Sequence, residues 1–592
     1  MNFFKLLLGS CLGTIAGILL LGIISFTILA GLASVSSNQS HKPLDKASFL
    51  EIRSDHVYPD KTDNVEKFNF SLTQKKEIGL TDLLLCIKKA SSDSKIKGIL
   101  FRSTYSNLGA ASAQALHNAL LDFKKSGKPI YAYADVYTEG AYYLASTADK
   151  VMLNPNGTID FRGYGAMIPF FKDLLDKVGI KFDIYYAGQF KSATEPFRLD
   201  KMSDQNRKQT REYLEDLYQI HLADIASSRN IPIDQIRKIA NEYLIQSPQD
   251  AVTYKLADTL GYVDDLYKLL QEGLKGSDAD KPSIVTINRY FETPGVKPVV
   301  TGATDRIAVV YAEGEIVDGE GKYGQTGSAK YTRILRKIRE DDKVKAVVLR
   351  INSPGGSSMA SDNILHEVDL IKSTGKPIVV SMGDYAASGG YYIACHADSI
   401  FAQANTITGS IGVFFMVPNA SELLNEKLGV NIDTVKTAKY ATAFSPLLPW
   451  SSEEGVFAQK QTDMVYDKFL TVVSKGRHQS KDDIHAIAQG RVWSGARAKS
   501  NGLVDQIGDL NDAMNCAARL AKLEKYKISE YPLVKDSWTK LIEEISNEDS
   551  NTEDILLKKY FKSWYPAVTY FKQMDQDYFK PKMLMPFQLL LK

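Results

Sequence analysis

The chain of 592 residues repeats itself at an offset of about 250 residues, and this duplication constrains its fold more than any other feature. Residues 95–102, KIKGILFR, match residues 343–350, KVKAVVLR. Further along, GYVD at residues 261–264 matches GLVD at residues 502–505. Chance is a poor explanation for several matches that occur in the same order and at similar offsets. The sequence therefore predicts two copies of one folding unit.

Each unit alternates short apolar runs with stretches that have the pattern of helices. In the second unit, residues 307–311, 346–349 and 377–381 are rich in β-branched side chains and are predicted strands. Helices are expected at residues 204–228, 329–340, 358–373 and 453–474. Strands that alternate with helices favour βαβ units, in which helices cover a largely parallel sheet. The predicted fold class is therefore α/β.

The duplication divides the chain into four parts. We expect a membrane anchor at residues 1–35, a first repeat at 48–290, a second repeat at 303–530 and a C-terminal extension at 531–592. A polar linker at residues 36–47 is expected to follow the anchor. Residues 272–304, which contain Gly, Asp, Lys and Pro, are expected to connect the two repeats.

The N-terminal segment predicts a membrane anchor. Residues 6–35 follow Lys5, carry no charge and are rich in Leu, Ile, Ala and Gly. A membrane helix needs roughly 20 apolar residues, whereas a cleaved signal peptide has an apolar core of about 7–15 residues. The run exceeds both lengths, which favours an uncleaved transmembrane helix. No comparable second run follows, so the rest of the chain is expected on one side of the membrane.

Charge and cysteine content exclude two classes of function. The net charge is only +2, from 72 basic and 70 acidic residues, and nucleic-acid-binding proteins usually carry a basic excess. The four cysteines, Cys11, Cys86, Cys395 and Cys516, form neither a CxxC pair nor a cluster with histidines. We therefore expect no nucleic-acid partner and no metal site.

The second unit carries a serine among very small residues. Ser388 lies within AASGGYY at residues 386–392, where small neighbours let a substrate backbone approach its hydroxyl closely. Upstream, NSPGG at residues 352–356 follows a predicted strand, and glycine N–H groups in such turns can face a developing oxyanion. Ser388 is thus a candidate nucleophile. The Pro-Gly-Gly sequence is explained equally well as a simple tight turn.

A serine nucleophile needs a base, and the nearby histidines do not provide an obvious one. His366 lies on the face of a predicted helix, and His396 lies in a His-Ala-Asp turn. Both are expected to be packing or surface residues. A buried lysine can act instead, because burial disfavours its charged form and lowers its pKa towards neutrality.

Alignment of the two repeats singles out one lysine. Lys191 falls opposite Ala441, whereas Ser388 falls opposite Glu139. One copy therefore has the serine without the lysine, and the other has the lysine without the serine. This complementarity makes Lys191 the candidate base for Ser388.

These motifs resemble the signal peptide peptidase A (protease IV) family in its long, duplicated form. The motifs that carry the resemblance are FKS at 190–192, NSPGG at 352–356, AASGGYY at 386–392 and TGSIG at 408–412. Nearly the whole chain is covered, and the resemblance implies a tandem pair of ClpP/crotonase-like domains. It implies a Ser/Lys dyad with Ser388 as nucleophile, Lys191 as general base and Ser410 as the residue that orients the lysine. The oxyanion hole is then expected from the N–H groups of Gly355, Gly356 and Gly389.

The resemblance also implies a function and a location. It implies a membrane-anchored serine endopeptidase without cofactor that degrades cleaved signal peptides and other short or unfolded chains. The expected assembly is a homotetramer whose sites face an enclosed cavity. Its expected location is the bacterial inner membrane, which it spans once, with the catalytic domains on the periplasmic (extracytoplasmic) side. Two arrangements of the dyad remain open. Both residues belong to one chain, or Lys191 of one subunit pairs with Ser388 of a neighbouring subunit.

Three other functions share part of this pattern. A ClpP-type Ser/His/Asp triad requires a histidine after the serine, but residues 410–416 read SIGVFFM. A crotonase-type acyl-CoA enzyme shares the fold but has no evident need for a membrane anchor or a Ser/Lys pair. An inactive membrane scaffold has no need for both members of a dyad. The sequence therefore favours the peptidase.

Overall fold

The computed structural model describes residues 43–62, 78–274, 282–296, 302–322, 324–533 and 582–585, together with Gly17 and Leu20. Apart from these last two residues, the predicted anchor at residues 1–35 lies outside the described residues, as does most of the predicted extension at 531–592. Within the part of the chain that is described, no helix is long and apolar enough to cross a membrane.

The first unit contains a parallel six-stranded sheet in the order β6-β4-β3-β2-β1-β7. Its strands are β1 (Ser48–Ile52), β2 (Ile96–Phe101), β3 (Ile130–Tyr137), β4 (Lys150–Ile159), β6 (Thr259–Leu260) and β7 (Ser283–Thr286). Its helices are α2 (Leu80–Ser92), α3 (Ala110–Lys124), α4 (Glu139–Ala145), α8 (Ile233–Asn241), α9 (Pro248–Thr253), α10 (Val263–Glu272) and α11 (Ile287–Phe291). Strands joined through helices produce the parallel pairing that the sequence predicted.

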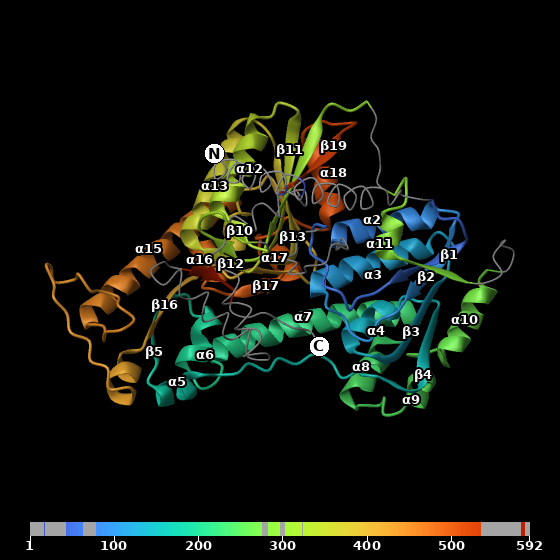
Figure 1. The fold of residues 1–592 in the computed structure, drawn as a ribbon, viewed down its shortest axis with the longest axis horizontal. Helices are drawn as coiled ribbons and strands as arrows, with labels where there is room; N and C mark the ends of the chain where they lie inside the picture. The colour runs from blue at the N-terminus through green and yellow to red at the C-terminus, as the bar shows by residue number, and fades with distance from the viewer. Residues whose placement is uncertain are drawn as a thin grey trace, which may run out of the picture.

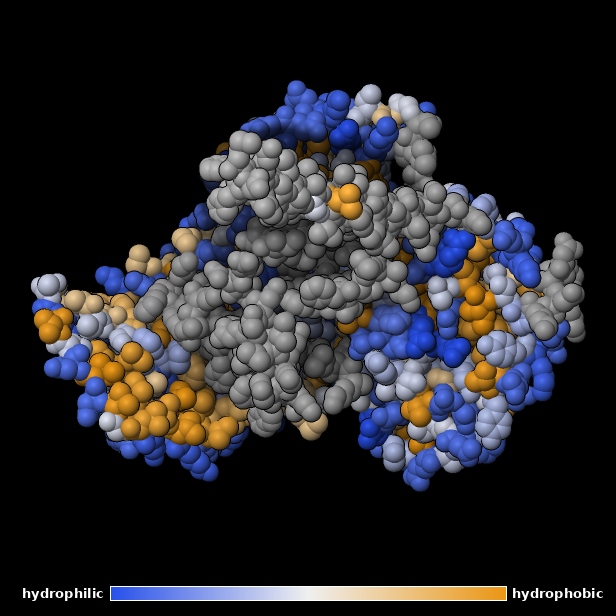
Figure 2. Space-filling view, viewed as in Figure 1, coloured by the Kyte–Doolittle hydropathy of each residue, from blue (hydrophilic) through white to orange (hydrophobic). Residues whose placement is uncertain are grey.

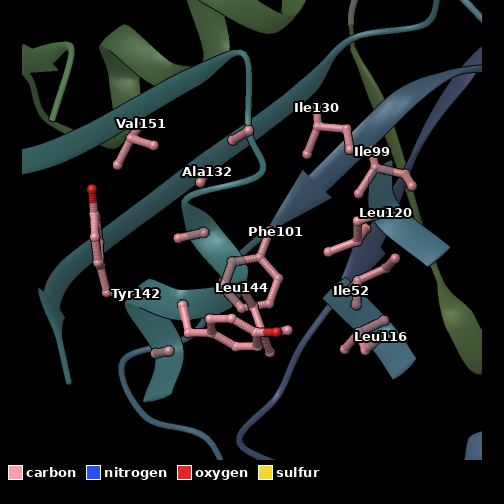
Figure 3. Packing of buried hydrophobic residues seen from close by; sticks show 14 of the residues in the cluster. Ile52, Ile99, Phe101, Leu116, Leu120, Ile130, Ala132, Tyr142, Leu144 and Val151 are labelled. Atoms are coloured by element: carbon pink, nitrogen blue, oxygen red, sulfur yellow. The ribbon is translucent and has the colours of Figure 1, made fainter. Parts of the chain in front are cut away.

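The core of the first unit lies between its sheet and its helices. Leu116 and Leu120, one turn apart on α3, point toward Ile52 of β1 and Ile99 of β2 (Figure 3). All four side chains are fully buried. Burial of each such side chain stabilises the fold by about 2 kcal/mol relative to exposure. This packing fixes α3 on the sheet.

The second unit repeats this plan with a larger sheet, in the order β17-β15-β13-β11-β8-β19 and with β14 and β18 branching from β13. Its strands are β8 (Arg306–Glu313), β11 (Val344–Ser353), β13 (Ile378–Ala387), β14 (Ser399–Ala402), β15 (Ile407–Gly409), β17 (Val492–Ser494), β18 (Gln506–Ile507) and β19 (Lys527–Tyr531). Its helices are α12 (Ser328–Glu340), α13 (Ser358–Ser373), α14 (Gly389–Tyr392), α16 (Lys481–Ile487), α17 (Gly495–Ser500) and α18 (Leu510–Leu520). The predicted strands and helices of this unit are confirmed.

Part of the expected connection at residues 272–304 belongs to the first unit, in agreement with the expected extent of the first repeat, 48–290. β7 pairs in parallel with β1 and so belongs to the sheet of the first unit. Helix α11 follows it directly, with Ile287 and Tyr290 buried. The apolar side chains of this stretch are buried against the first unit. The Gly and Pro residues around them have the pattern of a linker, so the sequence did not indicate this packing.

A third sheet joins the two units, in the order β10-β9-β12-β20-β16-β5. Its strands are β5 (Lys181–Ala187), β9 (Ile316–Val317), β10 (Thr326–Gly327), β12 (Gly355–Ser357), β16 (Val413–Asn419) and β20 (Lys582–Leu584). β5 of the first unit pairs antiparallel with β16 of the second along its whole length, from Ala187 opposite Val413 to Lys181 opposite Asn419. The residues that follow β5 are thereby held against the second unit.

Two long helices, α7 (Asp204–Arg229) and α15 (Ser452–Arg477), lie outside the three sheets, and α15 belongs to a projecting group of elements that we call the arm. Helices α5 (Lys172–Val178) and α6 (Glu195–Arg198) lie with α15, β5 and β16 in the arm, at the left of Figure 1. Helix α7 runs below the second unit from the first unit toward the arm (Figure 1). Both predicted helices, at 204–228 and 453–474, are confirmed. Hydrophobic residues gather on the surface of the arm (Figure 2).

A buried ion pair also joins the units. Arg350 of β11 donates two hydrogen bonds to the carboxylate of Asp60, which follows β1, at 3.0 and 3.1 Å. The side chains of Arg350 and Asp60 are only 9% and 2% exposed. Nearby, the carboxylate of Asp384 accepts hydrogen bonds from the N–H and the hydroxyl of Ser112 at 2.8 and 2.6 Å. These contacts fix the end of β13 relative to the first unit.

Candidate active site

Ser388 lies at the junction of β13 and α14, in a backbone conformation that is unusual for a residue with a side chain. Its φ is 56° and its ψ is −115°, and the residue is fully buried. Its N–H donates to the carbonyl of Gly409 at 2.8 Å. A strained conformation of this kind is concentrated at functional sites, where the surrounding structure enforces it. The turn places the hydroxyl at the end of the strand, beside the glycines of α14.

Lys191 reaches the same place from the first unit. It lies just after β5, and its side chain is fully buried. The preceding residue, Phe190, donates its N–H to the carbonyl of Gln489 in the second unit at 2.8 Å. Gly490 packs so closely that a Cβ there would lie 2.6 Å from the Cβ of Lys191. The lysine is therefore held between the two units.

The structure brings Lys191, Ser388 and Ser410 together. Lys191 Nζ lies 2.9 Å from Ser388 Oγ, 3.0 Å from Ser410 Oγ and 3.1 Å from the Ser410 carbonyl oxygen. Burial places the pKa of Lys191 well below the ordinary lysine value of 10.5. Within the described residues, these two serines are the only hydrogen-bond partners of Nζ, so no carboxylate there opposes the effect of burial.

The three glycines proposed for the oxyanion hole also lie together. A Cβ on Gly355 would lie 2.7 Å from the nitrogen of Gly389, and a Cβ on Gly389 would lie 3.2 Å from the nitrogen of Gly356. Gly355 has a φ of +102°, which favours glycine. Its N–H donates to Ser353 Oγ at 3.2 Å. Of the three predicted donors, Gly355 thus already has a hydrogen-bond acceptor within the chain.

A buried glutamine, which no sequence motif marks, holds the segment that carries the lysine. Gln209 of α7 donates to the carbonyl of Phe190 at 3.0 Å and to Ser192 Oγ at 2.9 Å. Its side-chain oxygen accepts from the N–H of Val492 in the second unit at 3.1 Å. Gln209 thus fixes the residues on both sides of Lys191. It was missed because its role depends on contacts distant in sequence.

No histidine among the described residues is a hydrogen-bond partner of Lys191 Nζ. His396 is buried, with its Nδ1 2.7 Å from Asp369 and its Nε2 3.0 Å from the carbonyl oxygen of Val472. The interpretation of His396 as a packing residue is confirmed. Among the described residues, no group of three or more His, Cys, Asp and Glu side chains has the geometry to hold a metal ion.

Glu139 occupies the position in the first unit that Ser388 occupies in the second. The side chain is buried at the start of α4, and its carboxylate accepts from the N–H groups of Arg162 and Gly163 at 3.1 and 2.7 Å. Burial raises the pKa of Glu139 from 4.5 to about 7, although these two hydrogen bonds oppose the shift. The first unit thus holds a carboxyl group where the second holds a hydroxyl.

This burial predicts a dependence of stability on pH. A carboxyl group whose pKa is higher in the folded state than in the unfolded state stabilises the fold below its unfolded pKa, and this contribution is lost as pH rises through the folded value. Between pH 5 and pH 8, Glu139 is expected to lower the free energy of unfolding by about 2–3 kcal/mol. Urea unfolding at both pH values should show that Glu139→Gln removes this difference, whereas Glu242→Gln, at an exposed site, does not. Equal pH dependence in both variants would contradict the assignment.

The class of protein follows from comparison of the whole chain with known families. The chain belongs to Peptidase family S49, which it matches twice, over residues 122–277 and 371–524. The two matches fall in the two units, as the duplication predicts. The predicted family membership is confirmed, and the protein is a serine peptidase of this family.

Three relatives that match most of the chain are proteases. Protease 4 of Haemophilus influenzae is 36% identical over 522 residues, which cover 85% of this chain and 82% of the relative. Protease 4 of Salmonella typhi is 36% identical over 78% of this chain and 75% of the relative. The chloroplastic serine protease SPPA of Arabidopsis thaliana is 32% identical over 74% of this chain and 64% of the relative. These alignments extend through both repeats.

Proposed function

We propose that the protein is an endopeptidase in which Ser388 is the nucleophile and Lys191 is the general base. The observation that carries the proposal is the 2.9 Å distance between Lys191 Nζ and Ser388 Oγ, both on fully buried residues. A buried amine is held in its neutral form, which is the form that accepts a proton. The S49 membership and the strained turn at Ser388 support the same roles.

The arrangement provides a mechanism for acyl transfer. As Ser388 Oγ attacks the carbonyl carbon of a peptide, its proton passes to neutral Lys191 Nζ. The oxyanion is received by the N–H groups of Gly356 and Gly389, each worth about 3–4 kcal/mol in the transition state. The Lys191 ammonium then protonates the leaving amine, and water, deprotonated by the same lysine, releases the acyl group. Ser410, through its hydroxyl and its carbonyl, keeps Nζ aligned throughout.

The pH dependence of hydrolysis tests the role of the lysine. Because only neutral Lys191 can accept the serine proton, kcat/KM for a fluorogenic peptide should rise with pH and reach its plateau well below pH 10.5. In Lys191→Arg, activity should be lost at every pH, because a guanidinium group keeps its proton. The measurement is the initial rate between pH 5 and pH 10. A rate that rises only near the ordinary lysine pKa would contradict a buried neutral base.

Reaction of Ser388 with a serine-directed phosphonate tests the nucleophile separately. Peptide mapping by mass spectrometry should place the label on Ser388, and Lys191→Arg should slow the labelling. Labelling of another serine with loss of peptidase activity would transfer the role to that residue.

Substrate, assembly and location belong to the same proposal. A nucleophile that is fully buried favours extended chains over folded ones, which supports short or unfolded substrates such as cleaved signal peptides. The uncharged run at residues 6–35 supports a single membrane anchor. The family resemblance implies that the catalytic units lie on the extracytoplasmic side of the bacterial inner membrane. Protease protection in inverted membrane vesicles tests the side.

The apolar arm supports self-assembly, and the family resemblance implies that the assembly is a homotetramer. Exposed apolar side chains on or beside it include Leu174, Val178, Leu428, Val430, Leu447 and Val456 (Figure 2). Exposed apolar patches of this kind mark interaction sites. Analytical ultracentrifugation of the detergent-solubilised protein tests the number of subunits.

A further inference from the structure

The segment at residues 582–585 lies inside the sheet that borders the site. β20 pairs antiparallel with β12 on one side, with Gly355 opposite Leu584 and Gly356 opposite Met583. On its other side β20 pairs with β16, where Lys582 lies opposite Phe414. This short strand therefore closes the gap between the two strands that flank Ser388.

The backbone of this segment approaches the candidate oxyanion glycines closely. A Cβ on Gly355 would collide with the carbonyl oxygen of Met583 and would also lie 2.7 Å from the nitrogen of Gly389. The N–H of Met585 extends the ladder by donating to the carbonyl of Pro354 at 2.8 Å. A peptide carbonyl thus lies next to the groups that would receive an oxyanion.

The side chains of the segment alternate as those of a bound strand do. Met583 and Met585 are only 2% and 3% exposed, whereas Lys582 and Leu584 are half-buried. Met583 packs into the core of the second unit. Met585 belongs to the same buried cluster as Ala387, the residue before Ser388, and Tyr213 of α7. The segment therefore fills two apolar pockets, one of them next to the serine and lined by both units.

Strand addition between two edges is a common way for proteins to bind an extended peptide, with the backbone supplying hydrogen bonds and alternate side chains filling pockets. Residues 582–585 meet both conditions at the candidate active site. They belong to the same chain, so their binding to the groove is intramolecular and does not depend on the protein concentration.

We propose that residues 582–585 are an internal competitor that occupies the peptide-binding groove, so that a substrate must displace them to reach Ser388. The proposal rests on the proposed function in one respect, which is that this groove is where substrates bind. Among the described residues, these contacts come from a segment of four residues. Displacement therefore needs a substrate that makes a longer ladder or fills the same pockets.

Charged residues in the two pockets test the proposal in the full-length protein. The double variant Met583→Asp, Met585→Asp should expel the segment, because a carboxylate is costly to bury in an apolar pocket. If the groove is free in about one molecule in ten, KM for a fluorogenic peptide should fall about tenfold while kcat stays unchanged. The single variant Met585→Asp should shift KM in the same direction.

The matched control is Leu584→Asp, which adds the same charge on the alternate, half-buried side of the strand. Its KM should stay within about twofold of the native value. An unchanged KM in both the double variant and Met585→Asp would overturn the proposal, as would an equal fall in KM in Leu584→Asp.

A binding measurement separates this proposal from the proposed function, because it needs no hydrolysis. A fluorescent peptide of sequence KPKMLMPF, residues 580–587, is titrated with full-length Ser388→Ala protein, with and without the two methionine substitutions. Polarisation should show about tenfold tighter binding when the internal segment carries the aspartates. Equal binding by both proteins would overturn the internal competitor even if peptide hydrolysis depends on Ser388 as proposed. Tighter binding would support it even if the native chain cleaved no peptide.

Discussion

Replacement of Ser388 by alanine is expected to lower kcat for peptide hydrolysis by about 10⁴-fold or more, because the proposed acyl intermediate forms on the Ser388 hydroxyl. Lys191→Met is expected to lower kcat by about 10²–10⁴-fold, since the attacking hydroxyl then keeps its proton. The two residues act in one proton transfer. The double variant should therefore be no less active than Ser388→Ala alone. Initial rates on a fluorogenic peptide measure all three effects.

Matched controls separate loss of chemistry from loss of structure. Ser146→Ala removes a fully buried serine from the first unit, where its hydroxyl donates to the carbonyl of Tyr143. Lys376→Met removes a lysine that donates to three backbone carbonyls in the second unit. Both controls should keep kcat within about threefold, and circular dichroism should show all variants folded. Native activity in Ser388→Ala would exclude the dyad.

Removal of one partner of the buried ion pair between the units should have the largest effect on stability. Asp60→Ala leaves Arg350 buried with only Ser381 Oγ and the carbonyl of Met382 as acceptors, at 3.0 and 2.8 Å. Breaking such a pair from one side costs about 3–5 kcal/mol. Urea unfolding should show a loss of this size, accompanied by lower peptidase activity, because the contact holds together the two units that supply the dyad.

Two further variants make this prediction specific. The exposed pair Arg333–Glu320 should contribute no more than about 1 kcal/mol, so Glu320→Ala should change stability little. The double variant Asp60→Ala, Arg350→Met removes both charges and should recover part of the loss, since no charge is left uncompensated. A loss below 1 kcal/mol in Asp60→Ala would show that water or other groups compensate Arg350.

The sequence predicted the parts of the site better than their assembly. Ser388 was recognisable from its small neighbours, and Lys191 because it falls opposite Ala441 whereas Ser388 falls opposite Glu139. Their proximity depends on the β5–β16 ladder, which pairs segments from different units and has no local sequence signature. The role of Gly490 could not be predicted either. Its lack of a side chain matters only because Lys191, from the other unit, packs against it.

The C-terminal strand shows the same limit. Residues 582–585 read KMLM, too short and too ambiguous to predict as a strand. They become one by pairing with β12 and β16, so their structure is supplied by their neighbours. The connection between the repeats is a second case, in which packing produced regular structure that the local sequence did not indicate. There the Gly and Pro residues of 272–304 suggested a linker, whereas packing on β1 and α2 made part of it a strand and a helix.

The composite origin of the site affects how the protein is made. A growing polypeptide that has emerged only as far as β5 and Lys191 holds a proton acceptor without a nucleophile. On the proposed mechanism, chemistry begins only when Ser388, synthesised much later, has docked on the earlier half. A nascent chain, or a truncated product that ends before Ser388, therefore cannot cleave neighbouring unfolded chains. The order of synthesis thus prevents premature activity, as a removable propeptide does in other proteases.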